Sequence, residues 1–65
     1  MNGEIIVFWK LPDGTRCSVL RRERTKWRLV IERNGTELLA EDYLDASALL
    51  RRANELRPVY ARSVA

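Results

Sequence analysis

The stretch that decides the fold runs from residue 27 to residue 41 and reads Trp27-Arg28-Leu29-Val30-Ile31-Glu32-Arg33-Asn34-Gly35-Thr36-Glu37-Leu38-Leu39-Ala40-Glu41. Asn34-Gly35 between two alternating runs predicts a β-hairpin, because a type I′ turn needs positive φ at both central residues, which Asn and Gly tolerate best. The turn also sets the register. The expected pairs are Arg33 with Thr36, Ile31 with Leu38 and Leu29 with Ala40 on one face, and Val30 with Leu39 and Arg28 with Glu41 on the other.

A second predicted hairpin precedes this stretch. Residues 4–10 form the first expected strand, and Pro12-Asp13-Gly14 predicts a three-residue loop because Pro presets φ and Gly accepts the left-handed position. The second strand, residues 15–22, then reaches Trp27 through the polar turn Glu23-Arg24-Thr25. The expected pairs are Leu11 with Thr15, Trp9 with Cys17, Val7 with Val19, Ile5 with Arg21, Val19 with Leu29 and Cys17 with Ile31.

These registers place one set of apolar residues on a common inner face: Ile5, Val7, Trp9, Cys17, Val19, Trp27, Leu29, Ile31, Leu38 and Ala40. A C-terminal helix is expected to cover them, because Asp45 is a good N-cap and Pro58 opposes continuation at the other end. Its inward stripe comprises Ala46, Leu49, Leu50, Ala53 and Leu56. The sequence therefore predicts an α+β fold, a four-stranded antiparallel β-meander in the order 1-2-3-4 with one C-terminal α-helix packed on one face. Residues 1–65 form one small domain, and residues 59–65 are expected to be a frayed tail.

A second apolar set falls on the face that the single helix leaves uncovered, and it is the candidate interface: Ile6, Phe8, Leu20, Val30 and Leu39. An uncovered apolar face usually marks an interaction site. A homodimer, through this face or through pairing of the first strand's edge, would add burial that a 65-residue chain lacks. The alternatives are cover by the C-terminal tail or by another protein.

Charge is unevenly distributed along the chain. The net charge is +3, with cations concentrated between residues 16 and 28 and anions between residues 32 and 45. Arginines on a hairpin can contact phosphates. The candidate nucleic-acid-binding residues are Arg16, Arg21, Arg22, Arg24, Lys26 and Arg28. The alternative is an ordinary solvated surface with cross-strand ion pairs such as Arg28 with Glu41.

Several function classes lack their usual residues in this chain. It contains no histidine and one cysteine, Cys17, which excludes an internal disulfide and a Cys/His zinc site. No activated nucleophile, catalytic base or Gly-rich phosphate loop is present, so we expect neither an enzyme nor a bound cofactor or small-molecule substrate. The N-terminal apolar run spans only residues 5–9 and no stretch approaches a bilayer-spanning length, so we expect a cytoplasmic protein that does not bind membranes.

The pattern Trp27-x-Leu29-x-Ile31-x-x-Asn34-Gly35, followed by a Leu-rich strand and Tyr43-x-Asp45-Ala46-Ser47-Ala48-Leu49-Leu50-x-x-Ala53-x-x-Leu56, resembles short uncharacterised bacterial proteins built as a meander followed by a helix. At the level of topology it also resembles the sheet-plus-helix DNA-binding modules of phage integrases and plant AP2-type domains. Its acidic third and fourth strands depart from those modules. The sequence thus favours a non-enzymatic interaction or regulatory protein that acts through self-association or a protein partner, with a nucleic-acid-binding module as the alternative.

Overall fold

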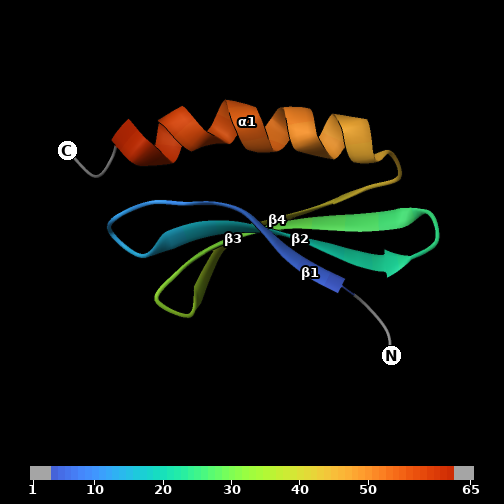
Figure 1. The fold of residues 1–65 in the computed structure, drawn as a ribbon, viewed down its shortest axis with the longest axis horizontal. Helices are drawn as coiled ribbons and strands as arrows, with labels where there is room; N and C mark the ends of the chain where they lie inside the picture. Colours follow the sequence, from blue (N-terminus) through green and yellow to red (C-terminus); the bar gives the residue numbers. More distant parts are fainter. Residues whose placement is uncertain (1–3, 63–65) are drawn as a thin grey trace.

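The computed structural model describes residues 4–62 and shows four strands followed by one helix (Figure 1). The elements are β1 (Glu4–Lys10), β2 (Thr15–Glu23), β3 (Lys26–Arg33), β4 (Thr36–Tyr43) and α1 (Ala46–Arg62). The strands are antiparallel neighbours in the order β1-β2-β3-β4, and α1 packs on one side of the sheet, chiefly over β3 and β4. The predicted fold class is confirmed. We call the side that faces α1 the helix side and the opposite side the open face.

Both predicted turns form as the sequence indicates. Asn34 and Gly35 have φ values of 50° and 86°, as a type I′ turn requires. Gly14 has φ of 95° and closes the first loop, in which the amide of Leu11 donates to the carbonyl of Thr15 at 2.8 Å. The two turns touch, because a Cβ added to Gly14 would lie 2.6 Å from Oδ1 of Asn34. Gly14 is therefore favoured by its backbone conformation, and the side chain of Asn34 would have to turn away from a Cβ placed there.

The predicted register of β3 with β4 is wrong beyond the first residues after the turn. Arg33 pairs with Thr36 as expected. Between the pair Glu32–Glu37 and the next pair, β4 carries one extra residue, so Ile31 pairs with Leu39 rather than with Leu38. The extra residue reverses the side of the sheet on which each later residue of β4 lies, compared with the predicted register. The remaining observed pairs are Val30 with Ala40, Leu29 with Glu41, Arg28 with Asp42 and Trp27 with Tyr43.

A second bulge, at Phe8 in β1, has the same effect on the first hairpin. Trp9 pairs with Cys17 as predicted, but Val7 pairs with Ser18, Ile6 with Val19 and Ile5 with Leu20. Ile6 therefore shares the helix side with Val19, while Ile5 and Val7 lie on the open face. At the far end of the sheet, β2 extends to Glu23, which pairs with Lys26 after an irregularity at Arg22, so the connection is the two-residue turn Arg24-Thr25. The predicted pairs of Val19 with Leu29 and Cys17 with Ile31 are confirmed.

The core lies between the sheet and α1 and consists of Trp9, Cys17, Val19, Leu29, Ile31, Leu49, Ala53 and Leu56. Leu11, Trp27, Leu39, Tyr43 and Tyr60 pack against it. Four residues predicted for the inner face are not in the core: Ile5, Val7, Leu38 and Ala40 are all exposed. The two bulges explain these errors, because strict alternation assigns the wrong side to each residue beyond a bulge.

The helix begins where predicted and ends later than predicted. Asp45 is its N-cap, since Oδ1 accepts a hydrogen bond from the amide of Ser47 at 3.0 Å. The expected end at Pro58 is wrong, because α1 continues to Arg62 and includes residues 59–62 of the predicted tail. Pro58 cannot donate to the carbonyl of Asn54, but both residues are exposed and water can bind there. Residues 63–65, the rest of that predicted tail, lie outside the described residues.

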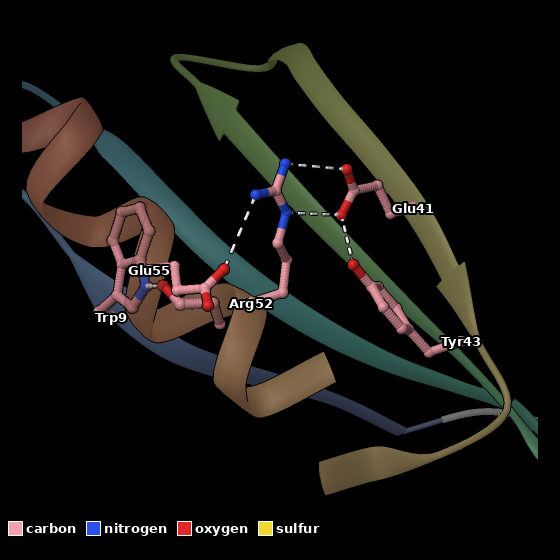
Figure 2. A network of polar contacts seen from close by, with 6 residues as sticks. Trp9, Glu41, Tyr43, Arg52 and Glu55 are labelled. Atoms are coloured by element: carbon pink, nitrogen blue, oxygen red, sulfur yellow. Dashed lines mark hydrogen bonds and ion pairs between the residues drawn. The ribbon is translucent and has the colours of Figure 1, made fainter. Parts of the chain in front are cut away.

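Two side-chain contacts attach α1 to the two edges of the sheet (Figure 2). From β1, the indole Nε1 of Trp9 donates a hydrogen bond to the carbonyl of Ala53 at 2.9 Å, and its ring lies 6.5 Å from that of Tyr60. From β4, Glu41 accepts hydrogen bonds from the hydroxyl of Tyr43 at 2.6 Å and from Nε of Arg52 at 3.2 Å. The helix is thus fixed in rotation as well as in position.

Two residues of the predicted inward stripe lie outside the core: Ala46 is half-buried, and Leu50 is exposed. Leu49, Ala53 and Leu56 are buried, but Leu50 is 39% exposed, so its predicted place in the core is wrong. Arg52 reaches β4, and at 100° per residue Leu50 lies on the opposite flank of α1, toward β1. Within residues 4–62 no helix has the length and apolar content needed to span a membrane.

Candidate functional site

The predicted candidate interface is divided between the two sides of the sheet. Leu20 and Val30 lie half-buried on the open face, as expected. Leu39 is wrongly assigned, because it packs against the core beside Ile31, and Ile6 lies on the helix side. Phe8 is the extra residue of the β1 bulge and is 38% exposed. The five residues do not form one surface.

Edge strand β1 presents a different apolar surface. Its consecutive residues Ile5, Ile6, Val7 and Phe8 are 69%, 55%, 42% and 38% exposed. We call these four residues the β1 edge patch. Because α1 lies chiefly over β3 and β4, it leaves Ile6 uncovered on the helix side, while Ile5 and Val7 project on the open face. A long apolar edge strand is a template for pairing with another strand, because its outer backbone groups have no partner in the sheet.

The open face around this strand is crossed by charged side chains. Lys10, Arg16 and Glu32 lie in one row, and Arg16 contacts Glu32 at 2.6 Å. Nearer the other end, Arg28 contacts Asp42 at 2.8 Å. Between these pairs, Val7, Ser18 and Val30 form the neighbouring row. The proposed cover of this face by the C-terminal tail is contradicted for Tyr60, which packs on the helix side against Trp9.

The candidate nucleic-acid-binding residues also fall into two groups. Arg16 and Arg28 are held by the open-face ion pairs, and the predicted partner of Arg28, Glu41, is replaced by Asp42 because of the β4 bulge. The other four, Arg21, Arg22, Arg24 and Lys26, are exposed at the end of the β2–β3 hairpin. We call residues 21–26 the basic tip.

One carboxylate lies beside the basic tip. Asp42 accepts hydrogen bonds from Nε of Arg28 at 2.8 Å and from its terminal nitrogen at 3.3 Å. The hydrogen bond from Arg28, together with the charges of Arg28, Arg22 and Lys26, lowers the pKa of Asp42. These residues line a hollow of about 330 Å³ with Glu23, Tyr43 and Leu44. Asp42 is therefore ionised at neutral pH and faces three cations.

Two observations on residues 4–62 concern thiol and metal chemistry. Cys17 is fully buried, and burial raises the pKa of its thiol to about 11, so the reactive thiolate is scarce near neutral pH. No group of three or more His, Cys, Asp or Glu side chains that could hold a metal ion occurs within residues 4–62. A hollow of about 430 Å³ lies between the two touching turns, and its charged side chains include the paired Arg16 and Glu32.

Comparisons of the chain with protein-family models, with curated proteins and with solved structures find no match.

Sequence reasoning misplaces three members of these surfaces. It assigns Ile5 and Val7 to the inner face, and it pairs Arg28 with Glu41 rather than with Asp42. Each error follows from a bulge, and neither bulge carries a local sequence signal such as a glycine at its extra residue. The apolar run at positions 5–9 is a usable signal, since strict alternation does not place adjacent apolar residues on both sides of a half-covered sheet.

Proposed function

We propose that this domain acts through self-association, by antiparallel pairing of β1 with β1 of a second copy. The observation that carries the proposal is the exposure of the β1 edge patch on both sides of one edge strand. Such a strand in solution invites association, and natural proteins usually blunt it with charges or cover it. Self-association supplies the cover and adds burial to a chain too short for a large core.

The sequence of β1 suits pairing with itself. An antiparallel pair centred on Val7 sets Val7 of one copy opposite Val7 of the other, and Ile6 opposite Phe8. Such a twofold contact is self-complementary, because each unlike pair occurs twice. Apolar residues then meet across the centre of the contact.

The helix flank supports the same arrangement. Ile6 is exposed on the helix side of β1, and Leu50 is exposed on the flank of α1 that faces β1. In a continuous sheet formed by two copies, Ile6 and Leu50 of each copy lie near the twofold axis, between the two helices. Pairing through the open face alone would leave Ile6 and Leu50 in water, so the exposed side chains favour the edge.

The expected affinity is modest. The β1 edge patch exposes on the order of 400 Å² per copy, the size of a typical functional patch on a monomer. Two such patches bury on the order of 800 Å², below the range of standard specific interfaces, so we expect a dissociation constant in the micromolar range. The dimer should therefore be studied over a concentration series.

Sedimentation velocity between about 5 and 200 µM tests the proposal over the range expected for a small interface. Wild type should shift with concentration from the 7.6 kDa monomer toward twice that mass. Ile6→Lys should remain a monomer, because it places a cation on the helix side of the edge. Leu20→Lys is the matched control on the open face and should still dimerise.

Two results would contradict the proposal. Wild type that stays a monomer at about 200 µM would remove self-association at any useful strength. A Leu20→Lys variant that is monomeric beside an Ile6→Lys variant that dimerises would assign the contact to the open face instead. Far-UV circular dichroism of each variant establishes that the fold is retained, which is expected because Ile6 is 55% exposed and Leu20 is half-buried on the uncovered side.

A further inference from the structure

The end of the β2–β3 hairpin projects beyond its neighbours as a two-stranded ribbon. β1 begins opposite Arg21 and β4 ends opposite Trp27, whereas the pairing of β2 with β3 continues to Glu23 and Lys26. Within the described part of the chain, residues 22–26 therefore have no strand on either side (Figure 1, on the right). A ribbon of two strands is narrow enough to enter the major groove of a nucleic-acid duplex.

Cations predominate among the side chains of this ribbon. The basic tip carries Arg21, Arg22, Arg24 and Lys26, all exposed, against the single acid Glu23. Glu23 is only a weak partner, since its carboxylate lies 3.9 Å from Nζ of Lys26 and both side chains are at least 60% exposed. Arg21 lies over the ring of Trp27 at 5.5 Å, which holds its guanidinium in place.

The composition of the tip distinguishes among polyanions. Residues 21–26 include no apolar side chain, so the tip has nothing to insert into the acyl region of a membrane. The cations instead follow one another along a ribbon, as a line of backbone phosphates requires.

We propose that the basic tip binds the phosphate backbone of duplex nucleic acid, and that Asp42 acts as an internal competitor that occupies Arg28. The Asp42 carboxylate, held by two hydrogen bonds from Arg28, stands in the hollow lined also by Arg22 and Lys26. A phosphate oxygen offers Arg28 the same acceptor geometry as this carboxylate. A duplex entering from the tip must therefore share Arg28 with Asp42.

The proposal gives a quantitative salt dependence. Each phosphate contact on B-form DNA contributes about −0.9 to the slope of the logarithm of the binding constant against the logarithm of salt concentration. Three to four contacts from the tip predict a slope of about −3, which corresponds to a loss of roughly sixtyfold in affinity between 50 and 200 mM salt. Binding should be insensitive to sequence, since the tip is assigned only backbone contacts.

Fluorescence anisotropy with a fluorescein-labelled 20-base-pair DNA duplex of mixed sequence tests the site. Arg22→Gln with Lys26→Gln should reduce the slope by about 1.8 and weaken binding at 50 mM salt by on the order of a hundredfold. Arg51→Gln with Arg57→Gln is the matched control, because it removes the same charge from exposed positions on α1. This control should leave the slope unchanged.

Asp42→Asn is the most specific arm of the test. It should tighten binding by about tenfold at 50 mM salt and steepen the slope by about 0.9, because Arg28 becomes available to one more phosphate. A purely structural role for the Arg28 and Asp42 pair predicts the opposite sign. Ile6→Lys should bind the duplex as wild type does, so failure of self-association and failure of duplex binding are separate outcomes.

Several outcomes would overturn the proposal. Absence of binding at 50 mM salt would remove it outright. Equal losses of affinity for the double variant in the basic tip and the double variant on α1 would attribute duplex binding to net charge alone. Binding to vesicles of phosphatidylcholine and phosphatidylserine without binding to the duplex would assign the tip to membranes instead. Unchanged or weaker binding by Asp42→Asn would refute the role given to Asp42.

Discussion

Replacing Trp9 by Phe tests the attachment of α1 to β1 at its most buried point. The indole is 7% exposed, and its Nε1 donates to the carbonyl of Ala53 at 2.9 Å. Loss of this hydrogen bond costs about 1 kcal/mol. The smaller ring gives up roughly 40 Å² of buried apolar area, which is worth about another 1 kcal/mol at 25 cal/mol/Å². A residual cavity adds to these terms, so we expect Trp9→Phe to lower the free energy of unfolding by about 2 to 3 kcal/mol.

That loss is large for this chain, because a core of this size rarely supplies more than about 3 to 5 kcal/mol. With a urea dependence of about 1 kcal/mol/M for a small domain, the unfolding midpoint should fall by about 2 to 3 M. The matched control is Trp27→Phe, at a half-buried ring whose Nε1 donates no hydrogen bond to any described residue. Its cost should not exceed about 1 kcal/mol.

Equilibrium urea unfolding followed by tryptophan fluorescence measures both variants, since each retains one of the two tryptophans as a reporter. Circular dichroism at 222 nm provides a second probe, and coincident transitions establish two-state behaviour. Equal midpoints for Trp9→Phe and Trp27→Phe, or a Trp9→Phe midpoint close to that of wild type, would refute the role of Trp9 as the attachment of the helix to the first strand.

The remaining predictions use the same unfolding assay or simple variants of it. Gly14→Ala should cost more stability than Gly35→Ala, because both have positive φ but only the first would bring a Cβ against the neighbouring turn; equal costs would contradict that contact. Hydrogen bonds from Tyr43 and then from Arg52 lower the pKa of Glu41. The ionised carboxylate therefore contributes to stability above its ordinary pKa of 4.5, and this contribution is lost as the pH falls through the lowered pKa. Stability should therefore decline on acidification below about pH 4.5, and Glu41→Gln should flatten that decline relative to wild type. The hydrogen bond to Glu41 raises the pKa of Tyr43 above its ordinary 10.0, so stability should also fall above pH 10.0 as the unfolded state loses this proton first. Cys17 should react with a thiol reagent at pH 8 only through opening of the fold, at a rate that rises in step with destabilising substitutions; rapid labelling of the native protein would contradict its complete burial.

The sequence predicts the positions of the strands, turns and helix better than it predicts the side of the sheet on which each residue lies. Asn34-Gly35, Gly14 and Asp45 each specify a local backbone conformation through their own chemistry, so both hairpin turns and the helix start follow directly. Pro58 is a weaker signal, because the cost of one missing hydrogen bond is small at an exposed position late in a helix whose Tyr60 packs against the core. Local chemistry thus determines where elements begin and turn.

The candidate surfaces depend on information that is not local. Whether Ile5 or Ile6 faces the helix depends on a bulge at Phe8, and whether Leu38 or Leu39 enters the core depends on the extra residue in β4. The β4 bulge brings Leu39 into the core in place of Leu38, and the β1 bulge puts Ile6 rather than Val7 on the helix side. Such choices follow from packing of the whole domain and have no signature in a short window of sequence.

The extra residues at Phe8 and Leu38 have a consequence for how this chain can change in length. Removing Leu38 would leave Glu37 and Leu39 adjacent, each still aligned with its present partner in β3, so the ladder could close without moving any core side chain. One-residue gaps in homologous chains should accordingly occur inside the two outer strands as readily as in the turns. Chains related to this one by descent would then look more divergent along the sequence than they are in three dimensions.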